Sequence, residues 1–163
     1  MRRNGFSVIE LLIAVLIIGI IAAIAMGNYF NAVHRAKQKK TMSDMRNIAV
    51  AWEARAVDTR QYNASGAIAL PDDTLDYPGL HHMLTPTYFR DFPRTDGWGF
   101  PLEFRIDSPV GSGTPAAGYA IRSPGRDGKF GDPYAGGPTT DYDCDIVYFG
   151  GQFVVWPEGV QQK

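Results

Sequence analysis

The chain has 163 residues, which is enough for one modest domain and a terminal segment. Its 17 acidic and 16 basic side chains leave a formal net charge of −1 at pH 7, so bulk attraction to nucleic acid has little support. The one cysteine, Cys144, excludes an intramolecular disulfide, and a small exported core without a disulfide gains stability from a metal or from subunit packing.

The N-terminus carries a long apolar run with one charge in it. Between Gly5 and Met26, Glu10 is the one ionisable side chain. A charged side chain in hydrocarbon costs about 2.5–3.5 kcal/mol on insertion scales, so a carboxylate there requires a partner. Because no basic side chain lies within the run, that partner must come from the start of the chain or from another molecule.

Two ordinary interpretations of residues 1–30 leave Glu10 unexplained. As a secretory signal, the segment has a basic start at Arg2 and Arg3 and a small-residue cleavage site at Ala23-Ile24-Ala25, but Glu10 opens its apolar core. As a plain anchor, Phe6–Phe30 is long enough to span a bilayer, yet the carboxylate has no purpose.

A third interpretation uses every unusual residue. The stretch from Arg2 to Glu10 closely resembles the class III signal of type IV pilins and type II secretion pseudopilins. The resemblance implies that a prepilin peptidase removes the leader, residues 1–5, after Gly5 and that the new N-terminus, Phe6, is N-methylated. Glu10 would then pair with the Phe6 ammonium of a neighbouring subunit, and pairing removes the cost of leaving either charge bare.

The helical pattern continues past the apolar run, residues 6–30, and becomes amphipathic. One buried stripe is predicted from apolar residues spaced at three and four positions: Met45, Ile48, Ala49, Trp52 and Ala56. We expect one helix from about Ser7 to Thr59, whose second half packs on its own domain. The basic run 34–40 is expected to be a solvated helix face, with contact to anionic lipid as the alternative.

The rest of the domain, which spans residues 31–163, reads as loops followed by strands. Residues 61–100 are loop-rich, with turns expected at 71–73, 77–79 and 96–99. Strand patterns follow at 102–106 and 119–122, and two more, 146–149 and 153–156, flank Gly150-Gly151 as a hairpin. The predicted fold is α+β and pilin-like, with the long helix packed on a small antiparallel sheet over residues 101–163.

Three further stretches resemble the major, G-type pseudopilin. They are Asp96-Gly97-Trp98-Gly99, the loop Ser123-Pro124-Gly125-Arg126-Asp127-Gly128, and Asp143-Cys144-Asp145-Ile146. The likeness therefore extends from the N-terminus into the predicted sheet.

Acidic residues crowd the glycine-rich connection between the predicted strands. Calcium takes about six to eight oxygen ligands from carboxylates and carbonyls, and a solvated acidic turn is the alternative. An EF-hand is excluded, because Ile146 and Gln152 stand where that loop needs glycine and glutamate. The resemblance implies a structural calcium ion held by Asp127, Asp143 and Asp145, with the carbonyls of Pro124 and Lys129 as donors and Asp132 and Asp141 as further candidates.

No enzyme motif is assembled by this sequence. His81-His82 lacks nearby ligands at zinc spacing, Ser112 is not in a nucleophile elbow, and there is no phosphate-binding loop. We expect a non-enzymatic protein.

The sequence thus predicts a structural subunit that self-assembles into a type IV-like filament, nearest the pseudopilus of type II protein secretion. The resemblance implies a prepilin peptidase, minor pseudopilins and an inner-membrane assembly platform as partners. It also implies a single-pass precursor in the bacterial inner membrane with a periplasmic domain, before assembly into a helical homo-oligomer that is a periplasmic or extracellular filament. One alternative is a type IV pilus or competence pilin serving adhesion, motility or DNA uptake. Another is a membrane-anchored or secreted binding domain.

Overall fold

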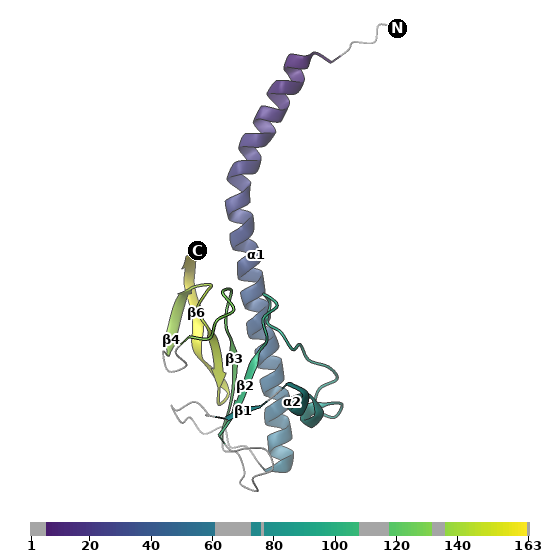
Figure 1. The fold of residues 1–163 in the computed structure, drawn as a ribbon, viewed down its shortest axis with the longest axis vertical. Helices are drawn as coiled ribbons and strands as arrows, with labels where there is room; N and C mark the ends of the chain where they lie inside the picture. Colours follow the sequence, from purple (N-terminus) through teal and green to yellow (C-terminus); the bar gives the residue numbers. More distant parts are fainter. Residues whose placement is uncertain (1–5, 61–72, 76, 108–117, 132–135, 163) are drawn as a thin grey trace. The chain divides into compact units, whose positions relative to one another are not determined.

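A computed structural model describes residues 6–60, 73–75, 77–107, 118–131 and 136–162 of the chain. It divides into two compact units, Met1–Arg35 and Ala36–Lys163. In chain order, the elements are α1 (Val8–Thr59), β1 (Asp73–Leu75), α2 (Tyr77–Leu84), β2 (Glu103–Ile106), β3 (Tyr119–Ser123), β4 (Gly137–Asp141), β5 (Ile146–Phe149) and β6 (Gln152–Gln162) (Figure 1).

The described part of the first unit is helical from Val8, and its side chains are uncovered. Every side chain from Phe6 to Ala32 is exposed, including the large apolar ones. By length and composition this helix is able to cross a membrane. A helix that is apolar on all sides is covered by lipid or by protein, so this unit requires an environment that the chain alone does not supply.

In the second unit, the amphipathic part of α1 packs against the sheet. The five residues of the predicted stripe are all buried, so this prediction is confirmed. Trp52 is fully buried, and its ring lies 4.7 Å from that of Tyr119 and 6.4 Å from that of Phe104, centroid to centroid. Since burying an aromatic ring removes about 150–250 Å² from water, Trp52 contributes a large part of the apolar area buried between helix and sheet.

In the described part of the chain, the sheet has six strands in the order β1-β2-β3-β5-β6-β4. Neighbours pair antiparallel except β4 and β6, which are parallel, so the predicted antiparallel sheet is wrong at this edge and the sheet is mixed. The predicted hairpin is confirmed: Gly150 and Gly151 have φ of 54° and 93°, conformations that glycine adopts without strain, between β5 and β6. The predicted α+β class, with a long helix on a small sheet, is also confirmed.

The region predicted as loops, 61–100, contains two regular elements in its described part. The turn expected at 77–79 is instead the start of α2, because proline is tolerated in the first turn of a helix. Leu80 and Leu84, four positions apart, are fully buried and join the core. Asp73, expected in a turn, begins the edge strand β1.

The turn at Asp96 connects the end of β3 to α1 by hydrogen bonds. The buried Asp96 carboxylate accepts the backbone N–H groups of Trp98 and Phe100 through Oδ1, both at 2.9 Å, and the Ser123 hydroxyl through Oδ2 at 2.8 Å. The Gly97 N–H donates to Thr41 Oγ1 on α1 at 2.9 Å. The predicted turn at 96–99 is therefore a hydrogen-bonded junction of helix, turn and sheet.

Candidate functional site

The processing and assembly motif lies at the start of α1. Gly5, the predicted cleavage site, is outside the described residues, and Phe6 is exposed. Glu10 Oε2 accepts the backbone N–H of Ser7 at 3.0 Å, while the Ser7 carbonyl accepts the N–H groups of Glu10 and Leu11. Glu10 therefore caps the N-terminus of its own helix, where a negative charge is also favoured by the helix dipole.

The capping contact is a function of Glu10 that the sequence prediction missed. The signal was present, because serine followed three positions later by glutamate is the pattern of a capping box. The expected pairing of Glu10 with a neighbour's Phe6 stays a prediction. The carboxylate in this predicted pair already accepts one hydrogen bond within its own chain, from the Ser7 N–H.

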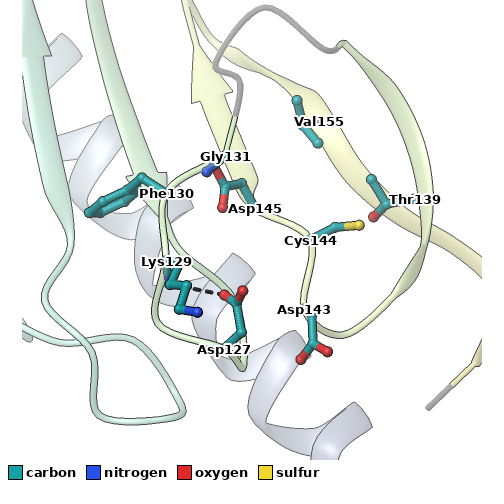
Figure 2. A pocket seen from close by; sticks show the side chains of 9 residues that line it. All are labelled: Asp127, Lys129, Phe130, Gly131, Thr139, Asp143, Cys144, Asp145 and Val155. Atoms are coloured by element: carbon teal, nitrogen blue, oxygen red, sulfur yellow. Dashed lines mark hydrogen bonds between the residues drawn. The ribbon is translucent and has the colours of Figure 1, made fainter.

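A pocket of about 320 Å³ lies between the loop that follows β3 and the turn that joins β4 to β5 (Figure 2). Three of the predicted calcium ligands, Asp127, Asp143 and Asp145, line it together. Among the described residues, the lining consists of Asp127, Lys129, Phe130, Gly131, Thr139, Asp143, Cys144, Asp145 and Val155. The structure thus brings the predicted carboxylates to one pocket, although they come from two segments of the chain.

Asp145 is held by a buried arginine. Its Oδ2 atom accepts Arg122 Nε at 2.8 Å, Arg122 Nη2 at 2.5 Å and the Gly131 N–H at 3.0 Å. Both side chains are largely buried, with exposed fractions of 5% for Arg122 and 10% for Asp145. Burial raises the pKa of Asp145, and the hydrogen bonds and charge of Arg122 act in the opposite direction.

The same guanidinium joins three further groups. Arg122 Nη2 donates to the Gly131 carbonyl, and Nη1 lies 3.5 Å from Glu103 Oε2 on β2. Its guanidinium carbon also stands 4.7 Å from the ring centroid of Phe130, a cation–π distance. Arg122 therefore links β2, β3, β5 and the loop through one buried positive charge.

Asp143 is held by a second arginine. Arg126 Nε donates to Asp143 Oδ1 at 2.6 Å and Nη2 to Oδ2 at 2.8 Å, a bidentate pair that uses both carboxylate oxygens. The hydrogen bonds that Arg126 donates to Asp143 raise the pKa of the guanidinium, and the charges of Asp143, Asp141 and Asp127 raise it further, against an opposing effect of burial.

The other predicted ligands have local roles. Asp127 Oδ1 accepts the Lys129 N–H at 2.9 Å, a contact drawn as the dashed line in Figure 2. Asp141, at the end of β4, accepts the Asp143 N–H at 3.1 Å. Pro124 is buried after β3 and Lys129 is exposed. Asp132 lies outside the described residues.

As these side chains stand, they do not fit a calcium ion. Their chemistry is suitable, since calcium prefers carboxylate and carbonyl oxygens. However, both oxygens of Asp143 and one oxygen of Asp145 are already hydrogen-bonded to guanidinium groups. In the described ranges, no three acidic, histidine or cysteine side chains are grouped so that they could hold a metal. The calcium site stays a prediction from the resemblance.

The two arginines are the residues of this site that sequence reasoning missed. Arg122 is the last residue of the strand pattern predicted at 119–122, and in a strand that alternates between core and solvent a charged residue is expected to face solvent. Every residue of β3 is buried instead: Tyr119 and Ile121 join the core around Trp52, and Ala120 packs in a second apolar cluster with residues of β5 and β6. A charged residue in a fully buried strand is a signal for a paired carboxylate, but the burial is not visible in the sequence.

Comparisons with known proteins agree with the resemblance in the N-terminal motif. Residues 1–26 match the family model described as the prokaryotic N-terminal methylation motif. The chain is 27% identical to type II secretion system core protein G of Pseudomonas aeruginosa over 147 residues, which cover 89% of this chain and 94% of that protein. It is 26% identical to the core protein G of Dickeya chrysanthemi, over 89% of this chain and 85% of the relative.

A second group of relatives is similar over a shorter stretch. The type IV major fimbrial protein FimA of Dichelobacter nodosus is 35% identical over 91 residues, which cover 47% of this chain and 57% of that protein. No solved structure matches the chain. The resemblance to type IV pilins and type II secretion pseudopilins is confirmed, and the N-terminal motif fits a filament subunit.

Proposed function

We propose that this chain is the main structural subunit of a type II secretion pseudopilus. The observation that carries the proposal is the extent of the similarity: it covers 89% of the chain for core protein G but 47% for the fimbrial protein. A similarity confined to the N-terminal helix would fit any member of the superfamily. One that continues through the sheet favours the secretion branch.

In this proposal, a prepilin peptidase cleaves after Gly5 and the amine of Phe6 is methylated. Before assembly, the apolar helix spans the inner membrane and the second unit lies in the periplasm. The exposed apolar side chains of α1 then pack against those of other copies, head to tail. A contact of this kind does not close into a ring, so it generates an open helical fibre. The role is structural and non-enzymatic, and minor pseudopilins and an inner-membrane platform are the proposed partners.

Glu10 is proposed to set the register of this packing. Its carboxylate would meet the Phe6 ammonium of the next subunit in a low-dielectric environment, where leaving either charge unpaired costs about 3–5 kcal/mol. Because the carboxylate also caps α1, loss of assembly in Glu10→Ala would not by itself distinguish the two roles.

The substitution Glu10→Gln separates them. Glutamine keeps an oxygen that accepts the Ser7 N–H but carries no charge, so it preserves the cap and removes the intersubunit pair. We expect Glu10→Gln and Glu10→Ala to reduce filament yield alike, by about tenfold or more, in electron micrographs of overexpressing cells. Filaments of normal yield from Glu10→Gln would contradict the pairing role and leave the cap as the requirement.

Two measurements test the proposal against its alternatives. Mass spectrometry of the mature chain is expected to find methylated Phe6 at its N-terminus; a start at Met26 would instead fit a secreted binding domain. Deletion of the gene is expected to stop the export of folded proteins and leave surface pili intact. Loss of surface pili with normal export would favour the type IV or competence pilin.

A further inference from the structure

The loop after β3 contacts the β4–β5 turn through both backbone and side-chain groups. The Arg126 N–H donates to the Tyr142 carbonyl at 2.9 Å, and the Arg126 side chain binds Asp143, the next residue. At Gly125, with φ of 73°, an added Cβ would lie 2.6 Å from the Cys144 carbonyl oxygen. The two segments are therefore in direct backbone contact on one side of the Arg126–Asp143 pair.

Arg122 contacts the loop at a second place, Gly131. Its guanidinium binds the carboxylate of Asp145, the residue before β5, and the carbonyl of Gly131, and so connects these two segments. The groups around this positive charge are carboxylate and carbonyl oxygens, the same donors that a calcium ion would use. A guanidinium satisfies them with directed N–H groups and one positive charge.

We propose that the guanidinium groups of Arg122 and Arg126 neutralise the carboxylates at this loop, so that the loop packs on the β4–β5 turn without a divalent ion. Arg126 takes both oxygens of Asp143, and Arg122 takes Oδ2 of Asp145. Both carboxylates that precede β5 and were expected to hold calcium are therefore neutralised by an arginine of the same chain. This inference concerns how the domain is held together and is independent of whether the chain forms a pseudopilus.

Thermal unfolding of the full-length protein in detergent micelles tests the proposal. The melting temperature is measured by circular dichroism with excess calcium chloride and with EGTA, for the wild-type protein, Arg126→Gln and Arg90→Gln. Arg90 is an exposed residue after α2, so its substitution removes the same charge at a distance from the loop. Arg126→Lys is a second variant that keeps the charge but loses the bidentate geometry.

Two results are expected together. The wild-type melting temperature is the same in calcium and in EGTA, and Arg126→Gln lowers it in both by about 2–4 °C relative to Arg90→Gln, the size expected for loss of about 1 kcal/mol in a domain of this length. The melting temperature of Arg126→Lys should lie between those of Arg126→Gln and Arg90→Gln.

Either of two other results would overturn the proposal. A fall of several degrees in the wild-type melting temperature with EGTA would make calcium the cation that closes the loop. A melting temperature for Arg126→Gln equal to that of Arg90→Gln would show that the arginine pair does not hold it. Filament formation, followed separately by microscopy, is not expected to depend on either outcome.

Discussion

The two units of this chain differ in the solvent exposure of their apolar side chains. In the first, Ile17 is 50% exposed and its neighbours along the helix are similarly uncovered; in the second, Ile48, on the same helix, is fully buried. Both stretches are helical, so helix propensity does not separate them. The first unit therefore requires lipid or other protein around its helix, whereas the second is stabilised by its own core.

Truncation of the core tryptophan is expected to destabilise the second unit more than any other change considered. Trp52→Ala removes a fully buried ring between α1 and the sheet and is expected to lower the free energy of unfolding by about 3–5 kcal/mol. Ile17→Ala, the matched change in the first unit, should leave the melting of the domain unchanged. Circular dichroism of the full chain in micelles measures both. A loss of less than about 1 kcal/mol for Trp52→Ala would contradict the packing described here.

The next effect concerns the buried charge of the second unit. Arg122→Met leaves the Asp145 carboxylate without its guanidinium, and we expect a loss of about 3 kcal/mol in denaturant unfolding. The double variant Arg122→Met/Asp145→Asn removes both charges and should recover part of that loss. If the double variant were less stable than Arg122→Met by the full cost of a second, independent substitution, the two side chains would not act as a pair.

The smallest effect compares a glycine from each unit. At Gly97, an added Cβ would lie 2.3 Å from the Lys37 carbonyl oxygen, so Gly97→Ala must separate the Asp96 turn from α1 and should cost about 1–3 kcal/mol. At Gly19, nothing lies within 4 Å, and Gly19→Ala should leave the domain as stable as before. Equal melting temperatures for the two variants would contradict the close approach at Gly97.

The parts of the fold that were predicted correctly depend on local patterns. The buried stripe of α1 follows from helical spacing, and the β5–β6 hairpin follows from a pair of glycines between two apolar runs. α2 was missed because Pro78 and Gly79 are typical of turns, although proline is compatible with a first helical turn.

The parts that were missed depend on contacts between distant segments. β4 begins Gly-Pro-Thr-Thr, a composition typical of loops, and becomes a strand by pairing parallel to the edge of β6, where proline is tolerated. At the acidic loop, the sequence predicted which carboxylates meet but not which cations meet them. Arg122 and Asp145 are 23 positions apart, and only the pairing of β3 with β5 brings them together.

The Glu10 side chain is able to cap its own helix and bind a second molecule at the same time. A carboxylate has two oxygens with separate lone pairs, and Ser7 uses Oε2 of Glu10. Among the described residues, no hydrogen bond to Oε1 is found, and the side chain is exposed. A donor from another molecule can therefore bind Oε1 while the cap stays in place. Under the proposed function, a subunit would join its neighbour without first unwinding the beginning of its own helix.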